Sequence, residues 1–229
     1  MKNRSKMYVE ASGNVEKAKL YEVSEAIKLL KSLKSKKFDE TVDLAIKLNI
    51  DAKKTDMNVR GSFVLPNGTG KTKRILVVTK TKASEATEAD FVGAEDILEK
   101  IEKENWFEFD IIVATPEMMP ALGKLGKVLG PKGLMPNPKL GTVTTNVKDA
   151  ITNIKKGMVD FKNDSYGNLH VSIGKLSFTE TALEENLRAL VNEIVRIKPA
   201  TVKGTFIKNI SLSSTMSPGI KLDKSSLGL

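Results

Sequence analysis

Apolar residues near the start of the chain recur at helical spacing. This spacing predicts a helix over 21–33 and a second helix that carries Val42, Ala45, Ile46 and Leu48. From Asp56 to Leu65 the pattern changes to strict alternation, which predicts a strand with Met57, Val59, Phe63 and Leu65 on one face. The break at 66–68 ends this strand.

Strands and helices alternate through the middle of the chain. We predict a strand of the buried type at 75–78, a polar helical stretch after Ser84, a short strand at 91–92, a helix over 95–103 and a strand at 111–113. This order is typical of a small, mainly parallel three-layer α/β domain. A further helix is predicted to end at Gly157, a suitable C-terminal cap, and to carry Val147, Ala150, Ile151 and Ile154.

The pattern after Gly157 indicates antiparallel structure. Strands over 158–162 and 169–173 flank a turn-forming segment, which predicts a hairpin. A helix over 181–198 is predicted to begin with a capping box of Thr181 and Glu184. Its apolar face holds Leu183, Leu187, Leu190, Val191 and Ile194. A last strand over 201–213 places Val202, Phe206, Ile210 and Leu212 inside and Lys203, Thr205, Asn209, Ser211 and Ser213 outside.

These elements predict a two-domain protein that combines α+β and α/β architecture. A split α+β domain, residues 1–67 and 159–229, contains both termini. It is interrupted by a three-layer α/β insert, residues 68–158. Two connecting strands form a hinge, for which the candidate residues are Pro66, Gly68, Gly70 and Gly157.

Composition adds information about partners. The 229 residues include 37 Lys and Arg against 28 Asp and Glu, a net charge of +9 that favours polyanionic partners. The absence of Cys excludes disulfides, thiolate metal sites and a cysteine nucleophile. The N-terminus is too polar for a signal peptide, and no apolar run approaches the roughly 18 residues of a membrane span. We therefore expect a cytoplasmic protein that does not contact membranes.

The segment 118–148 contains Gly, Pro and Lys but no acidic residue. Its lysines are Lys124, Lys127, Lys132, Lys139 and Lys148. Such a composition predicts a loop-like, solvated and positively charged surface that suits an anionic partner.

Two other features resemble active-site motifs. Residues 68–72, Gly-Thr-Gly-Lys-Thr, match the end of a phosphate-binding loop, but the first glycine of that motif would fall on Leu65 and a strand follows instead of a helix. His170 is the only histidine and has no carboxylate pair near it in sequence. We predict no catalytic residues, no metal site and no cofactor.

Two features leave alternatives open. Phe38 lies beside Lys36 and Lys37, so it is either a core residue, which composition favours, or a platform for a nucleobase. The outer face of the last strand is either merely solvated or binds phosphate and ribose. The second alternative is open because 194–222 contain cations and hydroxyls but no acid.

Several motifs are similar to those of a known family. They are Lys-Phe-Asp-Glu-Thr at 37–41, Arg-Gly at 60–61 with Leu-Pro at 65–66, Ala-Thr-Pro at 114–116, Leu-Gly-Pro-Lys-Gly-Leu-Met-Pro-Asn-Pro-Lys at 129–139, Ile-Gly-Lys at 173–175 and Lys-Gly-Thr-Phe at 203–206. Through them, essentially the whole chain resembles the universal ribosomal protein L1 family of bacterial type.

The resemblance implies a split RNA-binding domain with a Rossmann-like insert. It implies binding of 23S rRNA in the mobile stalk of the large ribosomal subunit, contact with exit-site tRNA, a part in the release of deacylated tRNA, and repression through the protein's own operon mRNA. It also leads us to expect a protein that is monomeric when free. A general RNA chaperone and a nucleotide-dependent enzyme are the alternatives that the sequence would otherwise suggest.

Carried over residue by residue, the resemblance implies a main RNA-binding surface. Its residues are Lys37, Phe38, Thr41, Lys162, Asp164, His170, Thr205, Asn209, Thr215 and Met216. Secondary contacts to RNA or tRNA would come from Lys124, Lys127, Lys132 and Lys139. One departure is Ser217, because the family usually has glycine after Thr-Met.

Overall fold

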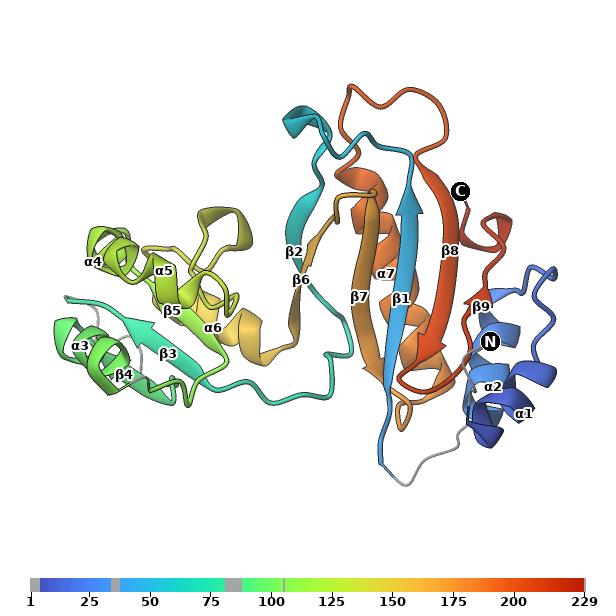
Figure 1. The fold of residues 1–229 in the computed structure, drawn as a ribbon, viewed down its shortest axis with the longest axis horizontal. Helices are drawn as coiled ribbons and strands as arrows, with labels where there is room; N and C mark the ends of the chain where they lie inside the picture. Colours follow the sequence, from blue (N-terminus) through green and yellow to red (C-terminus); the bar gives the residue numbers. More distant parts are fainter. Residues whose placement is uncertain (1–4, 34–37, 81–87, 105, 229) are drawn as a thin grey trace. The chain divides into compact units, whose positions relative to one another are not determined.

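A computed structural model describes residues 5–33, 38–80, 88–104 and 106–228 (Figure 1). The chain forms two compact units, and both mix helices with strands. The first, here called the split unit, comprises Met1–Gly70 and Val159–Leu229. The second, the insert unit, comprises Lys71–Met158.

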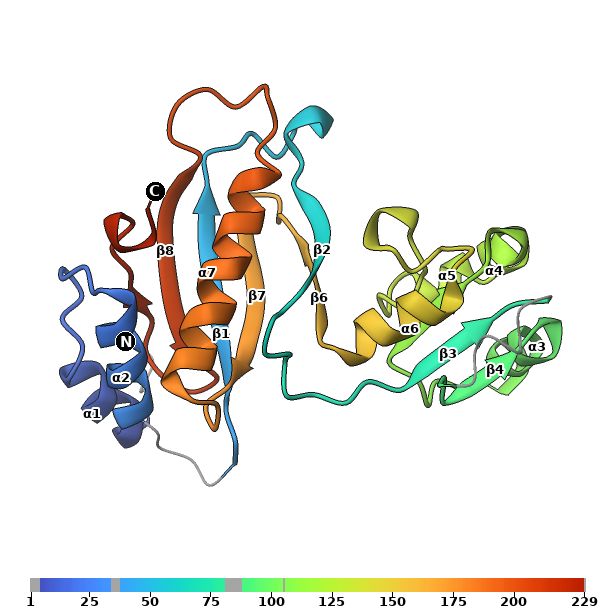
Figure 2. The same cartoon turned by 180° about the vertical axis from the view of Figure 1, so that it is seen from behind.

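The split unit is built on an antiparallel sheet of order β7-β1-β8-β9. Its strands are β1 (Thr41–Leu48), β7 (Asn168–Lys175), β8 (Ile207–Ser214) and β9 (Ile220–Lys221). Helix α7 (Glu180–Arg196) runs across one face of this sheet, as Figure 2 shows, and α2 (Val23–Ser32) packs against α7 and the β8–β9 edge. A short helix, α1 (Lys6–Gly13), precedes α2.

The core of the split unit lies between the sheet and these helices. Along β1, the residues that point to the helices are fully buried: Val42, Leu44, Ile46 and Leu48. Helix α7 contributes the face that the sequence predicts, and Leu183, Leu187, Leu190, Val191 and Ile194 are all buried. Each such side chain stabilises the fold by about 1.5–3 kcal/mol through its burial.

The predicted second helix is wrong, because residues 41–48 form β1. Val42, Ala45 and Ile46 fit helical spacing, but Val42, Leu44, Ile46 and Leu48 fit the period of a strand equally well. Pairing with β7 on one side and β8 on the other decides between the two patterns. That pairing joins residues far apart in the sequence, so local spacing could not show it.

The predicted hairpin is also wrong in its pairing. Strand β6 (Met158–Lys162) pairs with β2 (Arg60–Val64), whereas β7 joins β1. Asn163 continues the contact with the segment before β2: its backbone N–H donates to the Val59 carbonyl at 3.0 Å, and its side-chain oxygen accepts from the Val59 N–H at 2.8 Å.

Several predicted boundaries shift as well. The strand expected from Asp56 begins with a short 3-10 turn at Thr55–Met57, and β2 itself starts at Arg60. The last strand predicted over 201–213 is β8, which starts only at Ile207, and β9 follows it. The predicted capping box is wrong, since Thr179 caps α7 by accepting from the Ala182 N–H at 3.2 Å.

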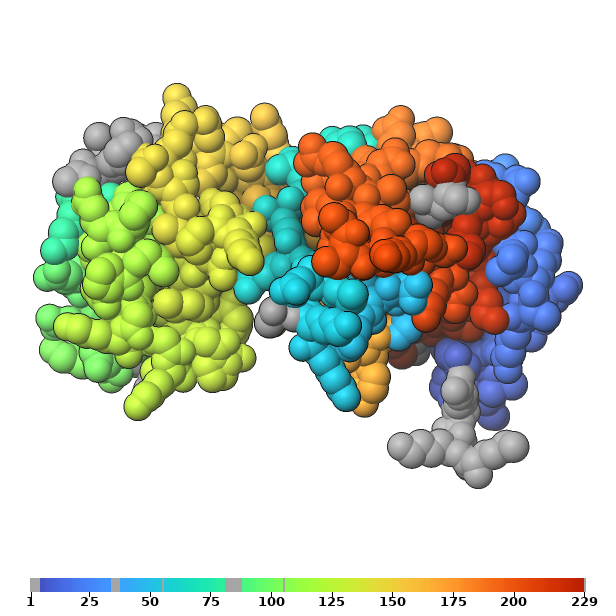
Figure 3. Space-filling model, turned by 90° about the horizontal axis from the view of Figure 1, so that it is seen from above, coloured from blue at the N-terminus to red at the C-terminus, as the bar shows by residue number. Residues whose placement is uncertain are grey.

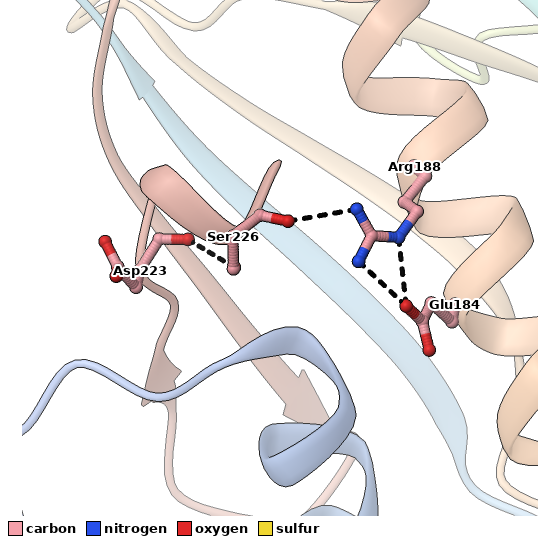
Figure 4. Close-up of polar contacts among 4 residues, drawn as sticks. All are labelled: Glu184, Arg188, Asp223 and Ser226. Atoms are coloured by element: carbon pink, nitrogen blue, oxygen red, sulfur yellow. Dashed lines mark hydrogen bonds and ion pairs between the residues drawn. The ribbon is translucent and has the colours of Figure 1, made fainter. Parts of the chain in front are cut away.

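Both chain ends lie in the split unit. Figure 3 shows N-terminal and C-terminal segments side by side on its surface, where Tyr21 bridges to Leu222. The C-terminal segment is also tied to α7, as Figure 4 shows. Arg188 pairs with Glu184 at 2.9 Å and donates to the Ser226 carbonyl at 2.9 Å, and the Ser226 hydroxyl donates to the Asp223 carbonyl at 2.7 Å.

The insert unit has a parallel sheet of order β4-β3-β5. Its elements are β3 (Ile75–Val78), β4 (Phe91–Gly93), α3 (Glu95–Glu104), β5 (Ile111–Ala114), α4 (Met119–Lys124), α5 (Gly126–Leu129) and α6 (Val147–Lys155). Residues of α3, α4 and α5 share one core cluster with Leu76, Val78 and Ile112, while α6 contacts β5. Most of the helical stretch predicted after Ser84 lies outside the described residues.

The segment 118–148 is less loop-like than its composition predicts. It contains α4 and α5, and its apolar residues Met118, Leu122, Leu125 and Leu129 are buried at helical spacing. The lysines are nevertheless exposed, so the predicted positive surface is present.

Candidate nucleic-acid interface

The sheet of the split unit has one face that the helices leave uncovered. Figure 1 looks onto this open face, since α7 lies behind the sheet. Along β1 the residues pointing to it are Thr41, Asp43, Ala45 and Lys47, all only partly buried. The register places polar neighbours beside them on both sides: Lys175, Ser172, His170 and Asn168 on β7, and Ser213, Ser211 and Asn209 on β8.

One end of the open face is formed by residues 38–41 and 215–217, together with Lys175 of β7. We call it the 38–41/215–217 cluster. Thr41 and Thr215 are joined by reciprocal bonds: the Thr215 N–H donates to the Thr41 carbonyl at 3.1 Å, and the Thr41 N–H donates to the Thr215 hydroxyl at 3.1 Å. Lys175 donates from Nζ to the Thr41 hydroxyl at 3.1 Å and to the Asp39 carbonyl at 3.3 Å. These bonds hold a cation and two hydroxyls side by side.

Phe38 and Met216 project from this cluster into solvent. Their exposed fractions are 49% and 45%, so about half of each apolar side chain faces solvent. The core position that composition favours for Phe38 is therefore wrong, and its ring is available to a partner.

A buried carboxyl group supports the cluster from below. Glu40 is 1% exposed, and its Oε2 accepts from the Ser214 hydroxyl at 2.5 Å and from the Met216 N–H at 3.1 Å. Among the described residues, no group hydrogen-bonds to its other oxygen, Oε1, which is also buried. Glu40 thus fixes the backbone from which Met216 projects.

Ser217 closes the same loop from the other side. Its hydroxyl accepts from the Ser214 N–H at 2.8 Å and donates to the Pro218 carbonyl at 3.1 Å. Ser217, at a position where the family resemblance led us to expect glycine, therefore contributes two hydrogen bonds within the loop.

The opposite end of the open face is formed by a turn and by the end of β1. The Asp164 carboxylate accepts from the Tyr166 N–H at 2.8 Å, the Asn168 N–H at 2.7 Å and the Asn168 amide at 2.8 Å. These donors, with the Asn168 N–H foremost, lower the pKa of Asp164, and nearby His170 lowers it further. Asp164 was predicted to contact RNA, and its carboxylate oxygens hold the turn together.

The predicted RNA-binding residues fall into two groups. Phe38, Thr41, Thr215 and Met216 lie in the 38–41/215–217 cluster, while Asp164, His170 and Asn209 lie toward the far end of the face. Because β1 rises about 3.3 Å per residue, Thr41 and Lys47 are separated by about 20 Å. Lys162 is exposed on β6 and Thr205 is exposed just before β8, outside both groups, and Lys37 lies outside the described residues.

Sequence reasoning missed Glu40, Lys47 and Lys175. Glu40 belongs to a quoted motif, yet a glutamate beside exposed residues gives no signal that it is buried. Lys175 also belongs to a motif, Ile-Gly-Lys at 173–175, but its place beside Thr41, like that of Lys47 beside Asn168, depends on the register of β1 and β7.

The lysines predicted for secondary contacts all lie in the insert unit. Lys124, Lys127, Lys132 and Lys139 are exposed. The Nζ of Lys132 lies 3.6 Å from the centre of the Phe107 ring, a cation–π contact that fixes one of these charges on the surface.

The first of the two segments predicted to form a hinge is bonded to the split unit. Asn186, fully buried on α7, accepts from the Asn67 N–H at 2.9 Å and donates to the Gly68 carbonyl at 3.1 Å and the Ile173 carbonyl at 2.8 Å. Gly70 has φ of +68°, and a Cβ there would lie 2.9 Å from side-chain atoms of Lys175 and Phe178. Gly157, after α6, has φ of +101°.

A sheet face that carries hydroxyls, amides and lysines, with exposed apolar side chains at its edge, is typical of proteins that bind structured nucleic acid. The comparison with known families shows the family of the chain. The model of the Ribosomal protein L1p/L10e family matches residues 29–218, and the chain belongs to this family of structural, non-enzymatic proteins.

Curated relatives match along nearly their whole length. "Large ribosomal subunit protein uL1" of Mesoplasma florum is 57% identical over 221 residues, which cover 96% of this chain and 97% of the relative. The proteins of the same name from Mycoplasma capricolum and Phytoplasma australiense are 56% and 54% identical, each over 96% of this chain and over 98% and 97% of their own lengths.

Two further observations concern metal binding and membrane insertion. Within residues 5–33, 38–80, 88–104 and 106–228, no three His, Cys, Asp or Glu side chains are grouped so as to hold a metal ion. In the same part of the chain, no helix has both the length and the apolar character needed to cross a membrane.

Proposed function

We propose that this protein is a structural component of the large ribosomal subunit that binds the stalk region of 23S rRNA in the cytoplasm. The 38–41/215–217 cluster carries this proposal. Phe38 and Met216 are exposed there, the buried Glu40 carboxyl group holds the backbone of Met216, and Lys175 and two hydroxyls belong to the same cluster. Apolar contacts beside cations and hydroxyls suit the shape, ribose and phosphates of folded RNA.

The proposal includes a division of roles between the units. The split unit makes the main RNA contact, and the exposed lysines of the insert unit contact secondary RNA or exit-site tRNA during release of deacylated tRNA. Relative motion would then take place at residues 71–74, which follow the anchored Gly70, and near Gly157, instead of at Pro66 and Gly68. Binding of the protein's own operon mRNA by the same cluster would make it a translational repressor, and the free protein would be monomeric.

The test is the affinity of the intact protein for a stalk RNA fragment and for a scrambled duplex of equal length, each measured across a salt series. Stalk binding that persists at salt concentrations that abolish scrambled binding would support a shaped site. Equal and steep loss for both RNAs would contradict it and would favour a general RNA chaperone that binds through charge alone.

Variants assign the site within the protein. Met216→Ala should weaken stalk binding, because it removes an exposed apolar side chain from the cluster. It leaves the charge unchanged, so binding to the scrambled duplex should stay the same and discrimination should fall. Lys139→Ala is a control in the insert unit, and it should reduce stalk affinity less than Met216→Ala does. Its main effect should be on the slope of log affinity against log salt concentration, which should become shallower by about one. A greater loss for Lys139→Ala than for Met216→Ala would move the primary site to the insert unit.

A further inference from the structure

An aromatic side chain stands out at the far end of the open face. Tyr166 is 77% exposed, more than any other large apolar side chain in the described part of the chain. Single exposed apolar residues are common and need no function on that ground alone. The surroundings of Tyr166 provide the further evidence.

The turn that presents Tyr166 is fixed at many points. The Asp164 carboxylate accepts from the N–H groups of Tyr166 and Asn168, and the Gly167 N–H donates to the Asp164 carbonyl at 3.1 Å. The Gly167 carbonyl accepts from the Leu48 N–H at 2.8 Å, which ties the turn to the end of β1. Binding through a ring on such a backbone would cost little conformational entropy.

Groups suited to a nucleobase surround this turn. Lys47 donates from Nζ to the Tyr166 carbonyl, and its neighbours in the sheet register are Asn168 on β7 and Asn209 on β8. The nearby acid, Asp164, already uses its carboxylate oxygens within the turn. This end of the face therefore offers an aromatic ring, a cation and amides, the groups with which proteins bind unpaired bases.

We propose that Tyr166, with Lys47 beside it, is a stacking platform for an unpaired base of the bound RNA. It would form a second contact point about 20 Å along β1 from the 38–41/215–217 cluster. The inference rests on the proposed function, and it names a residue of that interface that the family resemblance does not supply.

The test compares the intact protein with Tyr166→Ala and Tyr166→Phe for affinity toward the stalk RNA fragment. Loss of one base–aromatic stack should weaken binding roughly 5- to 150-fold in Tyr166→Ala. Tyr166→Phe retains the ring and should stay within about threefold of wild type. The salt slope should remain that of wild type in both variants, because neither changes the charge. Leu20→Ala is the control, because Leu20 is also highly exposed, at 57%, and lies before α2.

The outcomes separate this inference from the proposed function. If wild type fails to distinguish stalk RNA from the scrambled duplex, both proposals are wrong. If wild type does so and Tyr166→Ala binds equally well, the stacking platform is wrong while the proposed function stands. An equal loss in Tyr166→Phe would also refute stacking, and so would an equal loss in Leu20→Ala. Because Tyr166 is exposed, the variants should unfold at the denaturant concentration of wild type, and a matching unfolding midpoint shows that affinity reports on contact.

Discussion

Removal of the Glu40 carboxyl group tests whether buried bonds hold the RNA-facing loop. Glu40→Ala leaves the Ser214 hydroxyl and the Met216 N–H without their shared acceptor, in a region where Glu40 is 1% exposed. The buried Ser214 hydroxyl costs about 1–3 kcal/mol without a partner, and the part-buried Met216 N–H costs less, so the free energy of unfolding should fall by about 1–3 kcal/mol. Glu40→Gln retains an amide oxygen for both donors, and should lose less than about 1.5 kcal/mol.

The assay combines chemical denaturation with amide hydrogen exchange and stalk RNA affinity. Glu40→Ala should accelerate exchange at the Met216 N–H and weaken RNA binding, and Glu40→Gln should restore most of both. A cycle with Ser214→Ala measures the coupling of the pair, since residues in direct contact interact by about 0.5–3 kcal/mol. Near-zero coupling, together with wild-type affinity in Glu40→Ala, would refute the idea that this carboxyl group positions Met216.

Three further predictions concern other parts of the molecule. Asn186→Leu removes the partner of Asn67, Gly68 and Ile173 and should reduce the free energy of unfolding by about 2–4 kcal/mol in denaturant titrations, whereas exposed Asn146→Leu should cost less. Because the folded pKa of Asp164 is lowered, its contribution to stability is present above the ordinary aspartate pKa of about 3.9 and is lost as pH falls through the folded pKa; Asp164→Ala should therefore be less stable than wild type at neutral pH, with a gap that narrows in acid. Lys132→Ala should destabilise the insert unit by about 0.5–1 kcal/mol through loss of its contact with Phe107, and emission of Trp106, the one tryptophan, should report unfolding of that unit.

Sequence patterns predicted the elements whose apolar residues form one helical face or one unbroken run. Helix α7 and strands β3 and β5 lie close to the predicted ranges because their apolar residues repeat without interruption. The prediction for residues 41–48 failed because their apolar positions satisfy both a helical and a strand period. Only pairing with distant strands decides between the two. Helices α4 and α5 were not predicted, because the glycines and prolines around them indicate a loop and mask the spacing of Leu122, Leu125 and Leu129.

The candidate site was predictable only as a set of residue types. The family resemblance put Phe38, Thr41, Thr215 and Met216 in one predicted RNA-binding surface with six other residues, and the structure brings these four together. The sheet register separates Asn209 and His170 from that cluster, which no local pattern could indicate. The supporting bonds of Glu40 and Ser217 join segments about 175 residues apart or depend on a loop conformation, so they too required the fold.

The arrangement of acidic groups explains how a mixed-charge segment can serve an anionic partner. The motif 37–41 contains both Asp39 and Glu40, yet Glu40 is buried and the Asp39 carboxylate accepts from the Ser177 N–H at 3.0 Å and its hydroxyl at 2.8 Å. Asp164 is similarly engaged within its own turn. The Asp39 and Asp164 carboxylates thus direct their oxygens at donors of the protein itself, where they hold the backbone at the two ends of the face. Specific RNA affinity should therefore depend more on the acids that hold the two ends in shape than on the number of lysines, which governs the salt-dependent part of binding.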